Sequence, residues 1–558
     1  MNSFISPILA CDSYKLGHQS MYPKGMSLLY SNFTPRSNRL APGVGSSKPE
    51  RLVFYGLQGF MKWFLIEAFN KNFFEKDKNE VIAKYDKRTT AFLGEGAINS
   101  QHISDLHDLG YLPIEIKALP EGSLVDMKTP VLTIKNTHPN FAWLVNYLET
   151  AISSELWKSC TTATTAFEYK QLLTRFAQET GSPLDFVLWQ GHDFSLRGLS
   201  GLADAASSSG HLTSFLGSDT VPAADYVDAY YSGESTFVAG SVPASEHSVA
   251  SANILNTEGA TLLEKETKFF QKYVSELFPT GVVSYVSDTF SFWDVITKVA
   301  VDSKDHILSR KPNALGLAKT VFRPDSGNPV DILCGTAFDV SMSDTDSINN
   351  LIESNHLRHS KTPVVIRDGG KFYKVAWNHF DRYSPFLFEE VQPTPEMKGA
   401  VECLWDIFGG TTTETGHRIL NERVGLIYGD SITLDRAYNI LQKLKTKRFA
   451  SANVVFGIGS YTYQHVTRDS YGFAMKATYC EVDGVPLELY KDPKTDDGTK
   501  KSAKGLLRVE KVDGRFYTYD QQSASQEKDG VLGVVFRNSS LTKETTFEEI
   551  RAAVASFL

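Results

Sequence analysis

The chain has 558 residues, which is enough for two or three domains around a sizeable core. Hydrophobic residues make up 42% of it and charged residues 22%, both ordinary values for a globular protein. The formal net charge of -8 argues against a nucleic-acid binder that depends on overall basicity, because such proteins neutralise phosphates with excess Lys and Arg. This balance still leaves room for a local basic pocket that holds a phosphorylated small molecule.

The cysteines and the apolar runs bear on location. The five cysteines lie far apart and form no C-x-x-C pair, which fits a reducing compartment better than a disulfide framework or a zinc knuckle. No stretch approaches about 18 uninterrupted apolar residues, and no basic segment precedes an apolar run at the N-terminus. We therefore expect a cytoplasmic protein with no secretion signal and no membrane span.

The first third of the chain indicates a mixed α+β domain. Residues 51–76 carry apolar residues at helical spacing, and residues 112–137 alternate apolar and polar residues between Pro and Gly turns. We expect a helix in the first stretch and a small antiparallel sheet in the second. Antiparallel strand patterns return near the end of the chain. The sequence thus predicts an N-terminal domain over 1–184 that the segment 480–558 completes.

Residues 185–479 have a different pattern. Short apolar runs that end in polar residues or glycine alternate with helical stretches. Repeated strand–helix units predict a mainly parallel sheet, and we expect an irregular α/β barrel similar to a TIM barrel. Residues 330–423 interrupt the alternation and are interpreted as an insertion on the barrel. Within them, Asp368-Gly369-Gly370 predicts the turn of a β-hairpin.

Polar residues and glycines follow six of the predicted strands. The carboxyl ends of parallel strands in a barrel converge on one face, where active sites form. We therefore expect a site built from these residues: His192, Asp193, His247, Asp288, Arg323, Asp325, Asp430 and Gly459.

The most informative stretch is FRPDSGNP (322–329). Arg323 and Asp325 are two residues apart on a strand and face the same way. An Arg can grip a phosphate, and an Asp can orient a sugar hydroxyl or metal-bound water. The alternative is an ion pair that only caps the strand. After a further strand, Asp430 can bind ribose hydroxyls and Gly429 permits a close backbone approach. Gly459 ends another strand, in a nest for a terminal phosphate or in a simple turn.

Two other stretches suggest contacts to a flat ring. In GHDFSLRG (191–198), Phe194 can stack on a planar heterocycle and Arg197 can hold nearby anionic groups. In LGSDTV (216–221), Asp219 can accept from an amide N–H and repels a carboxylate. The pattern alone leaves structural roles open for all three.

Basic clusters and histidines complete the candidates. Lys and Arg gather at 467–476 and 491–505, either as solvated loops or as cations that hold several phosphates. A metal site built from His192, His211 and His247 lacks any metal-binding spacing, so we expect none.

A series of motifs runs in a fixed order along the chain: CDSYKLGHQSMYP (11–23), VFYGLQ, LPIEIKALPEG, HDFSLRG, GSDTV, SVPASEHS, VSDTF, FRPDSGNP, YGDS and FG-x-G. This series resembles the nicotinamide phosphoribosyltransferases, within the wider nicotinate phosphoribosyltransferase family. The resemblance covers most of the chain except 330–423 and the final segment. It implies the type II phosphoribosyltransferase architecture, an irregular α/β barrel with a flanking α+β domain, and homodimers with active sites at the subunit interface.

The resemblance also implies a reaction in NAD salvage. Members join nicotinamide to 5-phosphoribosyl 1-pyrophosphate and release nicotinamide mononucleotide and pyrophosphate. Magnesium is expected mainly through the substrate phosphates, with no dedicated set of protein ligands. ATP is expected as a co-substrate that phosphorylates the histidine matching His247.

By motif, the resemblance assigns a role to each candidate residue. His247, Asp288, Arg323 and Asp325 are expected to be catalytic. Phe194 and Tyr14 of the other subunit are expected to sandwich the pyridine ring, with Asp219 accepting from the carboxamide. The phosphoribosyl group is expected at Arg197, Arg323, Asp325, Gly429, Asp430, Gly459 and Ser460, and the phosphates or ATP at Arg36, Arg468, Lys476, Lys491 and Lys500.

Three alternatives remain open at this point. The nearest is a nicotinate phosphoribosyltransferase, which Asp219 disfavours through like-charge repulsion. A barrel glycosidase would use two of Asp219, Asp288 and Asp325 as its acids. A binding protein without catalysis would keep only the fold.

Overall fold

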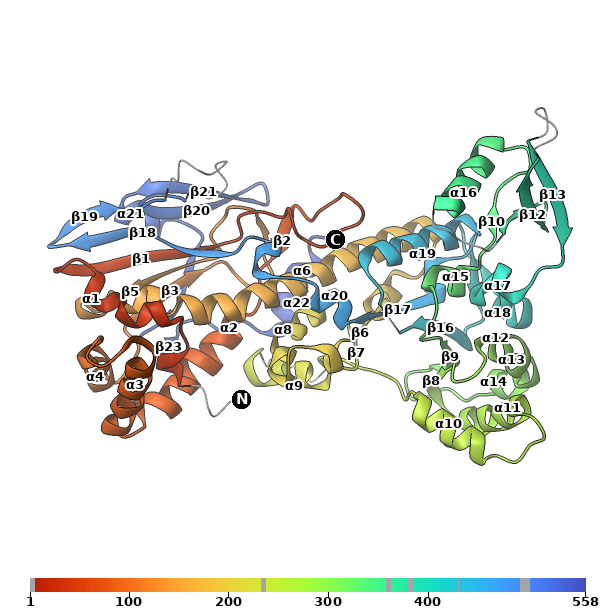
Figure 1. Cartoon of the computed structure of the whole chain (residues 1–558), viewed down its shortest axis with the longest axis horizontal. Helices are drawn as coiled ribbons and strands as arrows, with labels where there is room; N and C mark the ends of the chain where they lie inside the picture. The colour runs from red at the N-terminus through yellow and green to blue at the C-terminus, as the bar shows by residue number, and fades with distance from the viewer. Residues whose placement is uncertain (1–5, 232–236, 358–362, 379–384, 430, 492–501) are drawn as a thin grey trace. The chain divides into compact units, whose positions relative to one another are not determined.

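The computed structural model describes residues 6–231, 237–357, 363–378, 385–429, 431–491 and 502–558, and the chain forms two compact units (Figure 1). Unit 1 comprises 1–169, 195–239 and 462–558, and unit 2 comprises 170–194 and 240–461. The chain therefore leaves unit 1 and returns to it twice.

The unit boundaries differ from the expected domain boundaries in three places. Residues 170–184, expected in the N-terminal domain, belong to unit 2. Residues 462–479 belong to unit 1, because strand β18 (Ala474–Val482) pairs antiparallel with β1 (Met26–Thr34) along its whole length. Residues 195–239 also belong to unit 1, because Leu212 and Tyr226 pack in one apolar cluster with Tyr55. Both contacts join segments far apart in sequence, which a pattern read along the chain does not reveal.

Unit 1 is built around a seven-stranded antiparallel sheet. Its order is β19 (Val485–Glu488), β18, β1, β5 (Leu132–Asn136), β3 (Ile114–Ala118), β22 (Gly533–Arg537) and β23 (Ser540–Leu541). Two smaller pairs are β2 (Arg51–Val53) with β4 (Leu124–Asp126), and β20 (Leu506–Val512) with β21 (Arg515–Gln522). The antiparallel strands predicted within 112–137 are confirmed.

The helix predicted at 51–76 begins later than expected. Arg51–Val53 form strand β2, and the helical turns start with α2 (Leu57–Phe60) and continue to Phe74. Gly56 precedes α2 with φ 107°, a conformation that favours glycine. The buried Glu121 carboxylate accepts from the N–H groups of Gly56 and Gln58, so another segment of the chain caps this helix.

Unit 1 also contains elements that do not belong to this sheet (Figure 1). They are α1 (His18–Met21), α3 (Lys78–Leu93), α4 (Gln101–Leu109), α5 (Leu144–Tyr147), β7 (Gly217–Ser218), α8 (Ala205–Ser208), α9 (Val221–Tyr231), α21 (Ala524–Lys528) and α22 (Phe547–Ala555). Helix α6 (Glu149–Thr180) begins in unit 1 and ends in unit 2.

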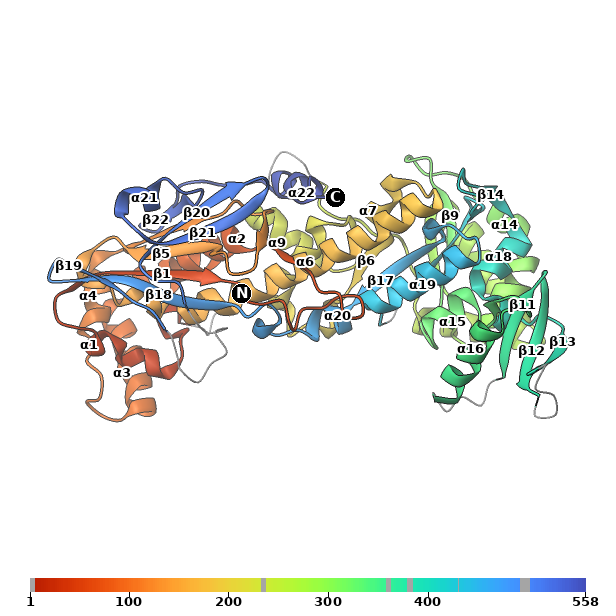
Figure 2. The ribbon, with the colours of Figure 1, turned by 90° about the horizontal axis from the view of Figure 1, so that it is seen from above.

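Unit 2 holds a curled parallel sheet, an open half-barrel in the described part of the chain (Figures 1 and 2). Its strand order is β6 (Gly191–Phe194), β17 (Val454–Gly459), β16 (Val424–Tyr428), β9 (Ala318–Arg323) and β8 (Gly281–Val286), and every neighbouring pair is parallel. This arrangement confirms the predicted α/β class and the irregular barrel.

Helices pack around this sheet. Phe270 of α11 (Leu262–Lys272) stacks on Phe322 of β9, with ring centroids 5.7 Å apart and an interplanar angle of 9°. The other helices of unit 2 outside the insertion are α7 (Val187–Gln190), α10 (His247–Asn256), α12 (Phe292–Asp294), α13 (Ala300–Asp302), α14 (Lys304–Leu308), α19 (Leu434–Thr446) and α20 (Ser460–Gln464), the last continuing into unit 1. Helix α15 (Pro329–Cys334) stands at the start of the insertion.

The segment interpreted as an insertion has its own small sheet of β10 (Phe338–Asp339), β11 (Val364–Asp368), β12 (Lys371–Trp377) and β13 (Phe386–Val391). The predicted hairpin is confirmed, since β11 and β12 are antiparallel and Gly369 and Gly370 turn between them at φ 55° and 82°. The segment also contains α16 (Thr345–Leu357), α17 (Pro395–Lys398), α18 (Ala400–Phe408) and the pair β14 (Gly410–Thr412) and β15 (Arg418–Leu420).

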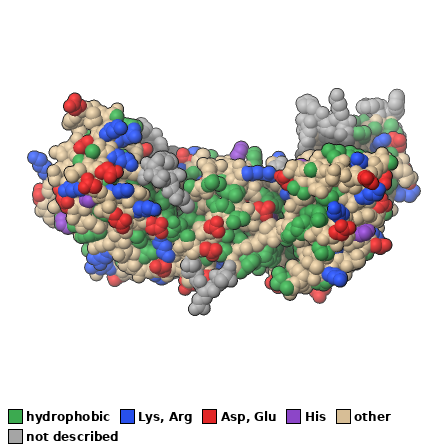
Figure 3. Space-filling view, turned by 90° about the horizontal axis from the view of Figure 1, so that it is seen from below, with side chains coloured by type: hydrophobic (Ala, Val, Ile, Leu, Met, Phe, Trp, Pro, Cys, Tyr) green, Lys and Arg blue, Asp and Glu red, His purple; other side chains and the backbone are tan. Residues whose placement is uncertain are grey.

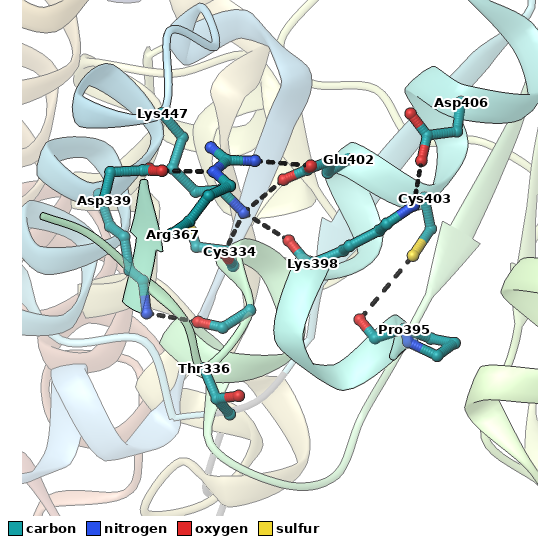
Figure 4. A network of polar contacts seen from close by, with 12 residues as sticks. Cys334, Thr336, Asp339, Arg367, Pro395, Lys398, Glu402, Cys403, Asp406 and Lys447 are labelled. Atoms are coloured by element: carbon teal, nitrogen blue, oxygen red, sulfur yellow. Dashed lines mark hydrogen bonds and ion pairs between the residues drawn. The ribbon is translucent and has the colours of Figure 1, made fainter. Parts of the chain in front are cut away.

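A buried polar network fastens the inserted sheet to the rest of unit 2 (Figure 4). Arg367 of β11 contacts Asp339 at 2.5 Å and Glu402 of α18 at 2.7 Å. Glu402 also lies 2.7 Å from the Lys447 ammonium, which donates to the Cys334 carbonyl at 2.8 Å. Two cations thus share one carboxylate in the interior.

The surface charges and the lengths of the helices are consistent with the expectations from composition. On the face drawn in Figure 3, Lys and Arg side chains lie among Asp and Glu side chains, and neither sign dominates the described residues. Within the described residues, every helix is too short or too polar to cross a membrane.

We predict that Glu402→Gln lowers the free energy of unfolding by about 3–5 kcal/mol, because it leaves the buried Lys447 ammonium without its carboxylate and takes one of two carboxylates from Arg367. Urea unfolding of the full chain measures the change. The matched control is Glu390→Gln, which breaks the exposed pair with Lys371 and is expected to cost about 1 kcal/mol or less. Equal small losses in the two variants would show that the network does not hold the insertion.

Candidate active site

The ends of β8 and β9 bring three of the predicted residues together. The strands are parallel neighbours with Val286 opposite Arg323, so the loops that follow them emerge side by side. Asp288 Oδ2 accepts from the Asp325 backbone N–H at 2.9 Å and from the Ser326 hydroxyl at 2.6 Å. One buried carboxylate therefore ties the two loops together.

His247 also reaches this group, although the prediction that it ends a strand is wrong. It is the first residue of α10, and only Ala244 pairs with β8, as an isolated parallel bridge to Ser284. The half-exposed imidazole has Nε2 at 3.8 Å from Asp288 Oδ1 and 4.0 Å from Asp325 Oδ2. Its Nδ1 lies 3.1 Å from the Thr289 hydroxyl.

Local hydrogen bonds explain why the strand before His247 stops. Pro243 has no N–H to donate to a ladder, and the Ser245 hydroxyl instead of its carbonyl accepts from the Val286 N–H at 2.9 Å. The Ser245 carbonyl accepts from Arg323 Nη2 at 2.7 Å. The chain is thereby turned away from the sheet and into α10. Glu246 caps no helical N–H with its side chain, which accepts from the Ser248 hydroxyl.

Arg323 is held by backbone on two sides. Its own N–H donates to the Ser287 hydroxyl at 3.2 Å, and the Ser287 N–H donates to its carbonyl at 2.9 Å. The guanidinium is fixed through Nη2, while its buried Nε has no hydrogen-bond partner within the described residues. The site therefore presents a positioned cation with unused donor capacity.

Gly429 follows β16, and Gly459 is the last residue of β17. A side chain at Gly429 would place its Cβ 2.9 Å from Asp325 Oδ1, whereas a Cβ at Gly459 would meet nothing within 4 Å. Ser460 follows as the first residue of α20. Asp430, predicted beside Gly429, lies outside the described residues.

Phe194 stands at the end of β6 against a glycine that the sequence reasoning missed. A Cβ at Gly457 would lie 2.6 Å from the Phe194 ring and 2.7 Å from the Tyr428 carbonyl oxygen. The ring is half-buried and 4.7 Å from the His192 ring, whose Nε2 lies 3.5 Å from the Ser241 hydroxyl. Gly457 is required for this close packing. Gly457 is the first glycine of the FG-x-G motif, and this motif was the only feature of the sequence that pointed to it.

The remaining predicted ring contacts lie in unit 1. Arg197 is exposed in a short 3-10 turn, and Asp219 is exposed just after β7. Tyr14 is 60% exposed. Its neighbours hold the segment in place, because the Asp12 carboxylate accepts from the Thr150 hydroxyl at 2.7 Å and Lys15 pairs with Glu149 at 2.7 Å.

Unit 1 contains a cavity of about 770 Å³ that two of the predicted phosphate-binding cations line, whereas Arg468 and Lys491 are not among its lining residues. Arg36 and Lys476 line it, and Arg36 Nε donates to the Gly472 carbonyl at 2.8 Å. Burial lowers the pKa of Lys476; of the nearby charges, Glu149 opposes this shift, while Arg36, Lys491 and Arg468 add to it. The cations Arg36, Lys491 and Arg468 therefore lie close enough to Lys476 to repel its ammonium group, an arrangement that favours binding of an anion.

Two further cations of this cavity escaped the sequence reasoning. Lys128 and Arg515 line its wall, and Arg515 pairs with Asp126 at 2.6 Å. Lys128 lies in a turn and Arg515 in β21, both outside the two basic clusters of the sequence, and nothing in their local sequence marks them. Lys500, predicted with this group, lies outside the described residues.

The three-histidine metal site finds no support. Both ring nitrogens of His211 face partners in unit 1, the Tyr463 hydroxyl at 2.7 Å and the Gly217 carbonyl at 3.1 Å. In the part of the chain that the structure describes, no three His, Cys, Asp or Glu side chains are grouped to hold a metal ion. Asp288 and Asp325 offer carboxylate oxygens, which suit a magnesium ion held mainly by other ligands.

We predict that Gly457→Ala lowers the free energy of unfolding by about 1–3 kcal/mol, because the new methyl group overlaps the Phe194 ring and the Tyr428 carbonyl. Gly459→Ala, two residues further on, meets open space and is expected to cost less than about 1 kcal/mol. Thermal unfolding of the two variants beside the unsubstituted chain measures the contrast, and equal stability would contradict the packing argument.

Comparison with protein-family models finds two matches. Residues 189–531 match the nicotinate phosphoribosyltransferase (NAPRTase) family, and residues 6–116 match the N-terminal domain of nicotinamide phosphoribosyltransferase. Together the matched segments cover most of both units.

Known proteins agree with this match. The chain is 50% identical over 559 residues to a protein of Acinetobacter baylyi named nicotinamide phosphoribosyltransferase, covering 100% of this chain and 99% of that protein. A Mycoplasma pneumoniae protein of the same name is 32% identical over 525 residues, covering 90% and 96%. A crystal structure of nicotinate-nucleotide pyrophosphorylase from Pyrococcus furiosus has a TM-score of 0.50 at 13% identity, covering 100% of this chain and 96% of that one, a likeness of fold alone.

Proposed function

Because the chain belongs to the nicotinate phosphoribosyltransferase family, we propose that it transfers the phosphoribosyl group of 5-phosphoribosyl 1-pyrophosphate to nicotinamide. The products are nicotinamide mononucleotide and pyrophosphate, and the reaction belongs to NAD salvage. The observation that carries the proposal is the full-length 50% identity to a protein named nicotinamide phosphoribosyltransferase. The family assignment sets aside the barrel glycosidase and the binding protein.

The proposed phosphoribosyl site is the group at the ends of β8, β9, β16 and β17. Arg323 supplies a fixed guanidinium, and Asp325 is held by the loop that Asp288 ties down. Gly429 keeps the space beside Asp325 free of a side chain. Gly459, Ser460, Asp430 and Arg197 complete the proposed contacts. Rigid placement of this kind favours transfer, because it holds C1 of the ribose before the attacking ring nitrogen.

The proposed base site consists of two aromatic rings and one acid. Phe194 is backed by Gly457, and the exposed Tyr14 of a second copy covers the other face of the pyridine ring. Asp219 accepts from the carboxamide N–H and repels the carboxylate of nicotinate. The proposal thus includes a homodimer, which the anchored but exposed position of Tyr14 supports.

Negative charge builds up on pyrophosphate as it leaves, so the reaction needs nearby cations to stabilise this group. Arg36, Arg468, Lys476, Lys491 and Lys500 are the proposed cations for the substrate phosphates or ATP, and the repulsion within the described members supports anion binding. Magnesium would be held mainly by the substrate phosphates, with Asp288 and Asp325 as additional oxygen donors, and it would neutralise the charge of the leaving group. We further propose a cytoplasmic location, which the five free thiols support.

His247 is the proposed phosphoryl acceptor from ATP. Thr289 holds Nδ1, which leaves Nε2 as the attacking nitrogen. The carboxylates of Asp288 and Asp325 lie too far from Nε2 for a direct hydrogen bond, but near enough to stabilise positive charge on the ring. Phosphorylation would then couple ATP hydrolysis to transfer.

We predict that pyrophosphate release with nicotinamide exceeds that with nicotinate by about a hundredfold in kcat/KM, because like charge at Asp219 costs several kcal/mol. A continuous pyrophosphate assay with both bases measures the ratio. The variant Asp219→Asn removes the charge and is expected to narrow the preference by raising the rate with nicotinate. A wild-type preference for nicotinate would overturn the substrate assignment.

We predict that His247→Ala abolishes stimulation by ATP while a weaker basal transfer remains. The same assay with and without ATP gives the stimulation ratio, which is expected to fall to about one because no phosphoryl acceptor is left. The control is His306→Ala, another exposed histidine of unit 2 whose ring also contacts a hydroxyl, that of Ser275 at 3.0 Å. Equal stimulation in His247→Ala and the unsubstituted enzyme would remove the phosphohistidine role.

A further inference from the structure

A second cavity, of about 370 Å³, lies within unit 1 and takes no part in the proposed reaction. Aromatic side chains form much of its wall: Phe60, Trp63, Trp157 and Tyr226. Its volume and aromatic lining are typical of pockets that enclose a small organic molecule. None of the residues to which we assign a role in phosphoribosyl transfer lines it.

The polar floor of the cavity is organised around an ion pair. Lys158 of α6 contacts the Asp204 carboxylate and donates to the Gln464 side-chain carbonyl at 3.0 Å. Gln464 Nε2 donates to Asp204 at 2.9 Å, and the Ser200 N–H donates to the same carboxylate at 3.0 Å. Asp204 is thus paired with Lys158 and accepts further hydrogen bonds from its neighbours.

Glu155 is the group that this network leaves out. It lies one helical turn before Lys158 on α6 and lines the cavity, yet its carboxylate makes no hydrogen bond or ion pair within the described residues. Burial and the charge of Asp204 raise its pKa to about 7. An acid in this setting lacks a counter-ion, since the neighbouring Lys158 is already committed to Asp204.

We propose that this cavity binds a small organic cation, an ammonium group carried on a flat or apolar body. With Lys158 and Asp204 neutralising each other, the ionised Glu155 leaves the cavity one negative charge. An ammonium ion would pair with that carboxylate in a desolvated setting, where charge-assisted hydrogen bonds are strongest. The faces of Trp63 and Trp157 add cation–π attraction and cover the apolar body.

The site would respond to pH in a definite direction. Below about pH 7 Glu155 is protonated and offers no charge, so affinity for a cation falls, and above it the carboxylate forms and affinity rises. Asp204 and Tyr226 do not titrate in this window, because the Lys158 and Ser207 contacts of Asp204 lower its pKa against the effect of burial, and burial raises that of Tyr226 well above its usual range. Lys158 remains paired with Asp204.

The test compares benzylammonium with benzyl alcohol, a neutral probe of the same shape, by isothermal titration calorimetry on the full chain. Quenching of tryptophan fluorescence reports occupancy independently, since two indoles line the cavity. We expect benzylammonium to bind about tenfold or more tightly than the alcohol at pH 8. This advantage should shrink toward pH 6.

Two Glu→Gln variants on helix α6 distinguish loss of the binding site from a general effect of removing a buried acid. Glu155→Gln is expected to reduce the affinity for benzylammonium to that for benzyl alcohol and to remove the pH dependence. The control Glu168→Gln changes another acid of α6 whose pKa burial raises to about 7, but which does not line the cavity, and it should bind as the unsubstituted chain does.

Equal affinity for the two probes, no binding of either, or unchanged binding in Glu155→Gln would each overturn the proposal. Circular dichroism establishes that the variant is folded. If Glu155→Gln fails to fold, the comparison of the two probes across pH in the unsubstituted chain still decides the matter.

Discussion

The geometry of the proposed active site depends on one carboxylate. Asp288 Oδ2 accepts two hydrogen bonds from the loop after β9, from the Asp325 N–H and the Ser326 hydroxyl. Because these bonds are charge-assisted, they are among the stronger ties available to a loop. They fix Asp325 relative to β8, and the second oxygen of the same carboxylate faces His247. Without Asp288, the loop that carries Asp325 would lose both of these hydrogen bonds, whereas Arg323 would keep its bonds to Ser287 and Ser245.

The parallel strands and several residues of the site could be predicted from the sequence. The residues that could not be predicted depend on contacts between distant segments. The apolar runs located the parallel strands, and the polar residues after them named Asp288, Arg323 and Asp325 correctly as neighbours of one strand edge. The position of His247 was misjudged, because Pro243 and the Ser245 hydroxyl interrupt a strand whose side-chain pattern looks intact. The Ser245 carbonyl accepts a hydrogen bond from the Arg323 side chain and not from a neighbouring strand. The residues packed beside Ser245 decide this, and the local sequence does not show it.

The missed residues follow the same rule. Gly457 matters because the Phe194 ring packs against it, and Thr289 because its hydroxyl meets His247. Arg515 of β21 joins the cavity that Arg36 of the N-terminal part of the chain also lines. Each contact forms only once distant segments are brought together. A single sequence identifies the chemistry of a strand end more readily than the side chains that support it.

Buried charge is handled in two opposite ways within the chain. Glu402 lies between two cations and contributes to holding a segment in place, whereas Glu155 faces a cavity with no cation of its own. The first arrangement is complete as it stands. In the second, burial and the charge of Asp204 raise the pKa of Glu155 to about 7, and a bound cation would stabilise its ionised form.

The proposed binding of the substrate phosphates by the cations of unit 1 has a consequence for the rate at which substrate arrives. The chain as a whole carries a formal charge of -8, so an anionic substrate is repelled at long range and attracted only near the cavity around Arg36 and Lys476. At physiological ionic strength the screening length is about 8 Å, which extinguishes the distant repulsion while leaving the local attraction. Moderate salt therefore helps the encounter, and strong salt slows it once the cavity's own field is screened.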